Sequence, residues 1–131
     1  VEPIVARFPE VKVALDHIGG APTDEEPPER LLNNVLRMAQ YPNVYVKFSA
    51  QPQKSKQKFP FRDTFSTFHR IYDAFGPERL MWGTNFPHVL HGIGYMQAME
   101  LFRESMDFLT SDDKEWLFHK TALRVWKFGV E

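Results

Sequence analysis

Arg79-Leu80-Met81-Trp82-Gly83-Thr84-Asn85-Phe86-Pro87-His88 is the stretch of sequence that decides the fold. Its apolar run of three residues is too short for a helix and ends at Gly83. A polar pair follows, and Phe86-Pro87 then stops regular structure. This profile predicts a buried strand over residues 80–83, whose tip presents Thr84 and Asn85, with His88 just beyond. In α/β proteins this end of a strand carries the chemistry.

Two further strands precede this one, and helices separate all three. Apolar runs predict strands over residues 11–17 and 44–49. Apolar residues at helical spacing predict helices near residues 29–40, 62–75, 95–109 and 112–126, the last capped by Thr110 or Ser111. On the first helix the predicted buried stripe is Leu31, Leu32, Val35, Leu36 and Ala39. Alternating strands and helices imply parallel strands with right-handed crossovers.

Two architectures fit this alternation. One is a three-stranded piece of a doubly wound sheet. The other is the last three units of a (β/α)8 barrel, which needs about 250 residues in total. Periodicity does not separate the two, although no glycine-rich phosphate loop follows any strand.

Composition limits the partners. The chain has 131 residues, a formal net charge of -1 and 43% hydrophobic content, which indicates one globular unit over residues 1–131. The near-neutral charge gives no reason to expect nucleic acid or a membrane surface as a partner. No cysteine is present, which excludes disulfides and a cysteine nucleophile and fits a cytoplasmic protein. Because the sequence opens at Val1 and not at Met, we expect a fragment of a longer protein.

Four motifs together resemble one family. They are Ala14-Leu15-Asp16-His17-Ile18-Gly19-Gly20, Asn43-Val44-Tyr45-Val46-Lys47-Phe48-Ser49, the stretch from Phe75-Gly76-Pro77-Glu78 to His88, and Phe118–Trp126. In this order and spacing they resemble the amidohydrolase-related (amidohydrolase-2) hydrolases and cover essentially the whole chain. The resemblance implies an α/β fold made of the C-terminal three βα units of a (β/α)8 TIM barrel. It departs from the family at Asn85, where the family carries Asp, and at Thr121, where Asn is usual.

The resemblance also implies a function. The Trp82-Gly83-Thr84 and Pro87-His88 variants resemble the lactonase branch, which includes 2-pyrone-4,6-dicarboxylate lactonase and sugar-lactone hydrolases. We therefore expect a hydrolase of a lactone or a related small carboxylated metabolite. A metal-dependent decarboxylase of the same family is one alternative. A catalytically silent barrel is the other, because Asn85 replaces the usual Asp.

Three residues are the expected catalytic positions. By resemblance, His17 polarises the carbonyl under attack. Asn85 occupies the position of the general base, but an amide is not basic enough to take a proton and is a poor zinc ligand. His88 is either a packing residue or a substitute base.

Three further residues are candidates for substrate binding. Asp16 either anchors the neighbouring backbone or His17, or it contacts substrate. Lys54 and Lys56, together with Lys58, lie in a predicted loop over residues 50–60 that contains no acidic residue. They either attract a carboxylated substrate or are simply solvated.

The family's metal centre needs a His-x-His pair that this chain lacks, since its histidines are His17, His69, His88, His91 and His119. We expect no complete metal site and no cofactor in the chain, with zinc possible in the full-length parent. The expected partner is a small-molecule substrate. Unpaired strand edges also predict a homo-oligomer or aggregation.

Overall fold

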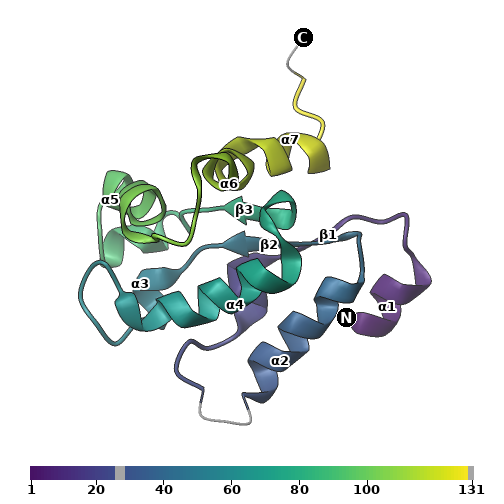
Figure 1. The fold of residues 1–131 in the computed structure, drawn as a ribbon, viewed down its shortest axis with the longest axis horizontal. Coiled ribbons are helices and arrows are strands. Elements are labelled where there is room, and N and C mark those ends of the chain that lie inside the picture. Colours follow the sequence, from purple (N-terminus) through teal and green to yellow (C-terminus); the bar gives the residue numbers. More distant parts are fainter. Residues whose placement is uncertain (26–28, 130–131) are drawn as a thin grey trace.

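The computed structural model describes residues 1–25 and 29–129. The sequence also predicts a loop rich in Pro and acidic residues over residues 22–28, and its last three residues lie outside the described ones. Its centre is a sheet of three parallel strands in the order β1-β2-β3 (Figure 1). The strands are β1 Val13–Leu15, β2 Val44–Phe48 and β3 Leu80–Trp82. In register, Leu15 pairs with Val46, and Phe48 pairs with Trp82. The predicted parallel strands are therefore confirmed.

Each strand is shorter than predicted at its carboxyl end. Residues 16–20 form the 3-10 turn η1 Asp16–Gly20 instead of continuing β1, and Ser49 and Gly83 lie outside β2 and β3. The backbone bends out of extended geometry at these points. The side chains at the β1 and β3 tips are exposed or half-buried, among them Asp16, His17 and Asn85, which the sequence singles out, whereas Ser49 and Ala50 at the β2 tip are buried.

Helices connect the strands. The longer ones follow the prediction: α2 Arg30–Arg37 continues into η2 Met38–Gln40, and η3 Arg62–Thr64 into α4 Phe65–Phe75. The remaining elements are α1 Glu2–Arg7, α3 Gln51–Lys54, η4 Pro77–Arg79, η5 His88–His91, α5 Tyr95–Glu100, the π-helical η6 Leu101–Ser105, α6 Ser111–Glu115, the π-helical η7 Trp116–Lys120 and α7 Thr121–Val125. The Thr110 side chain caps α6, as predicted, by accepting a hydrogen bond from the Asp113 N–H. In the described part of the chain, no helix has the length and apolar character to cross a membrane.

Two details of the helix prediction are wrong. The segment 95–109 stops being helical at Ser105, because Met106 takes an extended conformation. The predicted loop over residues 50–60 contains α3, a short helix with only one positively charged residue, Lys54. This helix proves important for the site.

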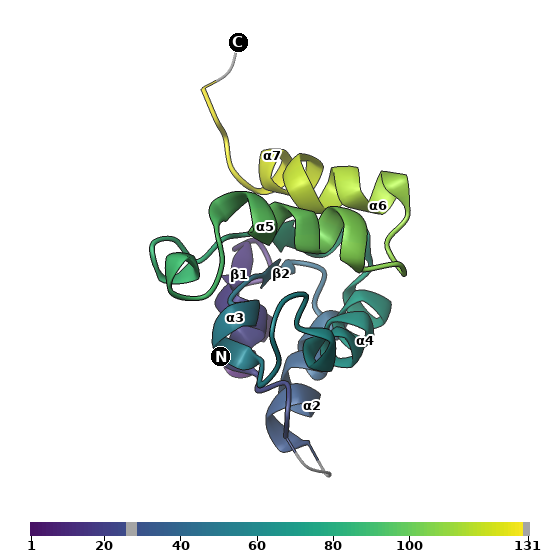
Figure 2. The same cartoon turned by 90° about the vertical axis from the view of Figure 1, so that its left-hand side faces the viewer.

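The core lies between the sheet and its helices. Figures 1 and 2 place the sheet between the C-terminal helices α5–α7 and the pair α2 and α4. On β2, Val44, Val46 and Phe48 are fully buried, and the Phe48 ring meets that of Phe68 edge-on with 4.7 Å between centroids. On α2, Leu32 and Val35 are buried as predicted, but Leu31 is 54% exposed, and Met38 at the start of η2 is buried although it was not predicted to be. Successive side chains of a strand point to opposite faces of the sheet. Tyr45 and Lys47 therefore lie on the face opposite to that of Val44, Val46 and Phe48.

Candidate functional site

The three strands end in the same unusual backbone conformation. His17, Ala50 and Asn85 have φ values of 52°, 68° and 58°, and each follows the end of its strand by two or three residues. A side chain makes this left-handed conformation unfavourable by about 1–2 kcal/mol. Such strain persists only where surrounding contacts hold it, and it is common at functional sites. The three tips therefore form one irregular, polar edge of the sheet.

His17 and Ser49 join the first two tips. The Nδ1 atom of His17 lies 2.8 Å from the Oγ atom of Ser49, and the Ser49 side chain is buried. On the other side of Ser49, a Cβ atom built on Gly83 would lie 3.6 Å from the Ser49 Cβ. The Gly83 N–H also donates to the Phe48 carbonyl at 3.1 Å. Ser49 thus occupies the centre of the edge, between the β1 and β3 tips.

Asp16 is engaged by the neighbouring strand. Its carboxylate forms an ion pair with the Lys47 ammonium at 2.6 Å, and this ammonium also lies 5.8 Å from the centroid of the Trp126 ring. Both partners are partly exposed, so the pair contributes little to stability. The partner of Asp16 is thus a side chain on the next strand, and not His17 or the neighbouring backbone as the anchoring interpretation expected. Contact between Asp16 and substrate stays a prediction.

The β3 tip is held through its backbone. The Asn85 carbonyl accepts a hydrogen bond from the Val89 N–H at 3.2 Å, which fixes the start of η5. Asn and Asp are among the few residues other than glycine that tolerate a left-handed φ. Within the described residues, the Asn85 side chain has no hydrogen-bond partner. Its amide is half-buried and available at the edge.

His88 is exposed and lies at the first position of η5. The Gln53 side-chain amide donates to the His88 carbonyl at 2.9 Å, and the His88 and His91 rings lie 6.0 Å apart. No contact in the described part of the chain joins His88 to His17 or Ser49. The structure therefore brings His17 together with Ser49, and it attaches His88 to α3.

The two candidate lysines are engaged within the chain. Lys54 belongs to α3 and not to a loop; its ammonium donates to the Ala21 carbonyl at 2.6 Å, and burial lowers the pKa of this group. The Lys54 carbonyl accepts from the Thr23 hydroxyl at 2.6 Å. The Lys56 ammonium pairs with Asp24 at 2.5 Å. Helix α3 therefore forms hydrogen bonds both with the loop after β1 and with η5.

Sequence reasoning missed Ser49 as a candidate site residue and missed the burial of Gln51. Ser49 closes the second strand motif, and its place directly after a buried strand was the available signal. Gln51 follows two residues later, is 4% exposed, and has a side-chain nitrogen without a hydrogen-bond partner in the described residues. No signal in the sequence distinguished its burial.

The donors do not fit a metal centre. Over residues 1–25 and 29–129, no group of three or more His, Asp or Glu side chains is placed to hold a metal ion. The β3 tip supplies an amide in place of a carboxylate, which is a poor zinc ligand. The described residues alone do not provide the ligand set that zinc requires.

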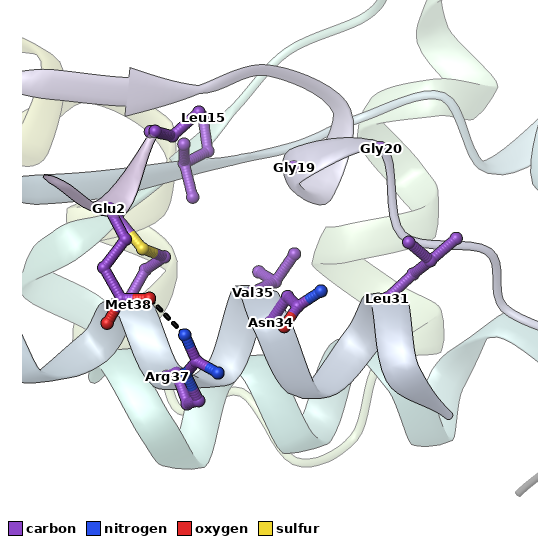
Figure 3. Close-up of a pocket in the computed structure, with 10 residues that line it drawn as sticks. Glu2, Leu15, Gly19, Gly20, Leu31, Asn34, Val35, Arg37 and Met38 are labelled. Carbon is purple, nitrogen blue, oxygen red and sulfur yellow. Dashed lines mark hydrogen bonds and ion pairs between the residues drawn. The ribbon is translucent and has the colours of Figure 1, made fainter. Parts of the chain in front are cut away.

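A hollow of about 320 Å³ lies behind the β1 tip, between η1 and α2 (Figure 3). Its walls include Leu15, Gly19, Leu31 and Val35, and the ion pair between Glu2 and Arg37 closes one end. Gly19 is required there, because a Cβ atom would come within 2.7 Å of the Val35 side chain. The hollow does not include His17, Ser49 or Asn85, so it is separate from the edge that carries the polar side chains.

The fold and the site define a class: an α/β protein of parallel βα units with its polar side chains gathered at the carboxyl ends of the strands. The family model of the amidohydrolases, Amidohydro_2, matches residues 1–128. The chain therefore belongs to the amidohydrolase family.

Solved structures agree with this assignment. An amidohydrolase from Burkholderia multivorans with bound zinc superposes with a TM-score of 0.81 at 26% identity, over 95% of this chain and 47% of that one. Amidohydrolase 2 from Bifidobacterium longum subsp. infantis gives a TM-score of 0.68 at 26% identity, over 92% of this chain and 42% of that one. A candidate 2-pyrone-4,6-dicarboxylic acid hydrolase from Pseudomonas putida gives 0.78 at 20% identity, over 100% and 49%, a likeness of fold alone.

One curated relative is similar over a shorter stretch. D-galactarolactone isomerase from Agrobacterium fabrum is 35% identical over 54 residues, which are 41% of this chain and 18% of that protein. The chain thus spans about half the length of the solved relatives. Its match to D-galactarolactone isomerase covers a smaller share of that protein. The α/β fold with three parallel strands corresponds to part of each amidohydrolase.

Proposed function

We propose that the chain forms the last three βα units of a (β/α)8 barrel and that this barrel hydrolyses a lactone. Three parallel strands in sequence order and a length near half that of the solved amidohydrolases support the barrel. The single observation that carries the function is the contact between His17 and Ser49 at the carboxyl ends of adjacent strands. In barrels, this is the end where catalytic side chains gather.

Lactone opening needs a group that stabilises negative charge on the carbonyl oxygen. Water adds to the carbonyl carbon, the ring C–O bond then breaks, and one proton of the water passes to the departing ring oxygen. The products are one hydroxyl and one carboxylate, and the second proton of the water is released to solvent. An N–H of the His17 ring, held in place by Ser49, donates to the oxygen that becomes negative.

A base must also take a proton from the attacking water, and Asn85 does not supply it. In an Asp-bearing relative the carboxylate at this position does so. In this chain His88 is the first substitute, since it lies three residues beyond Asn85. The residues of the whole protein outside this chain are the other source.

Lactone as the substrate class rests on two likenesses. The lactonase-like motif at the β3 tip is one. The other is the similarity to D-galactarolactone isomerase, a protein named for a lactone. Because Lys54 and Lys56 already contact groups within the chain, recognition of a substrate carboxylate falls to other residues. A zinc ion, as in the Burkholderia multivorans amidohydrolase, would need ligands beyond those that the described residues supply.

The test is a panel of sugar lactones and 2-pyrone-4,6-dicarboxylate, assayed with the full-length barrel in water enriched in ¹⁸O. Hydrolysis places one ¹⁸O atom in the carboxylate product. Isomerisation without water places none, and loss of CO₂ from the pyrone would favour the decarboxylase. The matched control is His17→Asn, which keeps a residue tolerant of the left-handed φ but removes the ring.

A catalytically silent barrel is the second candidate, and Asn85 is the observation that favours it. In that case the edge binds a ligand without turnover. Absence of product from every lactone in the panel, combined with saturable binding of one of them by calorimetry, would support this candidate over the hydrolase.

A further inference from the structure

We propose that Ser49 is a positioning residue that fixes the tautomer of His17, so that the ring carries its proton on Nε2. The inference deepens the proposed function and rests on it for its catalytic meaning. The tautomer itself is a property of the chain and is measurable without any substrate. Nothing in the strand motif alone requires it, because the motif does not show what the serine contacts.

The first step is the geometry of the contact. Ser49 Oγ and His17 Nδ1 lie 2.8 Å apart, a normal hydrogen-bond distance. The contact joins residues 32 positions apart in the sequence, on the tips of adjacent parallel strands. It is therefore a tertiary feature that orients the ring relative to the sheet.

The protons available on the two groups determine the direction of this hydrogen bond. A serine hydroxyl carries one proton to donate, and a neutral imidazole has one donor and one acceptor nitrogen. Ser49 is 1% exposed, and within the described residues its hydroxyl has no hydrogen-bond partner other than His17. Buried hydroxyl protons are almost always donated. The arrangement that satisfies Ser49 is an Oγ–H that donates to Nδ1, which leaves the ring proton on Nε2.

This tautomer determines which atom of the ring can donate. Nδ1 is occupied as an acceptor, so Nε2–H is the remaining donor of the ring. A donor at that atom suits the stabilisation of a developing oxyanion, whereas the opposite tautomer would present a lone pair there. The ring is thus set as an electrophilic group and not as a base.

The residues around Ser49 leave it in contact with His17. The left-handed φ of 52° at His17 turns the backbone at the β1 tip, and Gly83 leaves room beside the serine. The nearest charged groups at this edge, Asp16 and Lys47, are paired with each other. Within the described residues, no other hydrogen-bond acceptor competes with Nδ1 for the serine proton.

The experiment is long-range ¹H–¹⁵N NMR of the histidine rings in the full-length barrel labelled with ¹⁵N-histidine. The spectra are recorded at about pH 8.5, well above the ordinary histidine pKa of about 6.5. His17→Asn assigns the ring. We expect His17 to show a protonated Nε2 and an unprotonated Nδ1. Ser49→Ala should convert this ring to a mixture of both tautomers.

Activity provides a second readout. Ser49→Ala should lower kcat for lactone hydrolysis about tenfold and change KM less than twofold, because the lost effect concerns the oxyanion. The matched control is Thr64→Val, which removes another buried hydroxyl that donates to a carbonyl, that of Phe61. It should change neither the His17 tautomer nor kcat per folded molecule.

The outcomes are decisive. A protonated Nδ1 on His17 in the unmodified protein overturns the proposal, as does an unchanged tautomer in Ser49→Ala. If Ser49→Ala does not fold, Ser49→Cys replaces it, since a thiol is a weak donor of similar size. Absence of lactone turnover overturns the proposed function, while the NMR result still decides the role of Ser49.

Discussion

The tips of β1 and β3 have the same backbone conformation but side chains of different chemistry. His17 and Asn85 have left-handed φ values within a few degrees of each other, 52° and 58°. At the first tip, a buried serine contacts the imidazole of His17. At the second, the backbone is fixed by the Val89 N–H, while the side chain is a neutral amide.

This difference corresponds to two separate requirements of the proposed hydrolysis, which are polarisation of the carbonyl and removal of a proton from water. In the proposed lactone reaction, His17 at the β1 tip polarises the carbonyl, whereas Asn85 at the β3 tip takes no proton from water. The two tips share a left-handed backbone conformation, and the proposal requires a base that the Asn85 side chain does not supply.

The largest expected effect comes from restoring that group. Asn85→Asp in the full-length barrel should raise lactone hydrolysis by about 10²–10⁴-fold, the usual contribution of a positioned base. The rate should fall on the acidic side of the pH profile, because the carboxylate must be ionised to accept a proton. Asn85→Gly, which tolerates the same φ without an acid, should give no gain. An unmodified protein already as fast as the Asp variant would mean that the base lies elsewhere, with His88 tested next.

The second effect tests the other tip. In the Asn85→Asp background, His17→Ala should lower kcat by about 10²-fold through loss of oxyanion stabilisation. His17→Asn, which accommodates the left-handed φ better than alanine, should lose as much activity with less loss of stability. Steady-state kinetics and urea denaturation measure the two quantities. Recovery of the rate by Asn would show that the backbone, and not the ring, is what matters.

A third, smaller effect concerns the space between the tips. Gly83→Ala places a Cβ atom 3.6 Å from that of Ser49, an ordinary contact, so activity should be nearly unchanged. Gly83→Val adds two methyl groups there and should displace Ser49, lowering kcat by about tenfold. Equal rates for the two variants would show that the position of Ser49 is not critical.

The smallest effect is expected far from both tips. Tyr72 donates to Asp113 Oδ2 at 3.0 Å, and Tyr72→Phe should lower the free energy of unfolding by about 1 kcal/mol. Its hydrolytic rate per folded molecule should not change. Urea titrations paired with rate assays check both; a fall in that rate would mean that α4 influences the site.

The same variant has a defined pH dependence. Burial opposes the charge on Asp113, but hydrogen bonds from the Thr110 hydroxyl and N–H and from Tyr72 outweigh it and lower the pKa of Asp113 below 3.8. A lowered carboxyl pKa stabilises the fold above pH 3.8, and this contribution is lost as the pH falls through the folded-state pKa. Tyr72→Phe brings that pKa nearer to 3.8. The stability difference between the two proteins should therefore be largest above about pH 4 and shrink below it.

The sequence allowed much of the scaffold to be predicted, because local patterns determine it. Apolar runs and helical spacing located three parallel strands and most connecting helices. Helix α3 escaped prediction, since four residues carry too little periodicity and tertiary contacts such as that of Lys54 with Ala21 hold it. On α2, the predicted buried stripe included Leu31, but packing buries Met38.

The strand-tip positions of two candidate site residues could be predicted for the same reason. His17 and Asn85 stand out because each follows an apolar run. The partner of His17 does not, because Ser49 is 32 residues away and only the strand pairing brings it close. Lys54 and Lys56 looked available in sequence, whereas folding pairs them with groups from the loop after β1.

The backbone at Asn85 has a consequence for how this protein changes over evolution. Asn and Asp both tolerate a φ of 58°, and their codons differ at a single base. A point mutation can therefore exchange amide for acid at this position without rebuilding the turn. Exchange between amide and acid is then a single genetic step, and the fold around this position need not change.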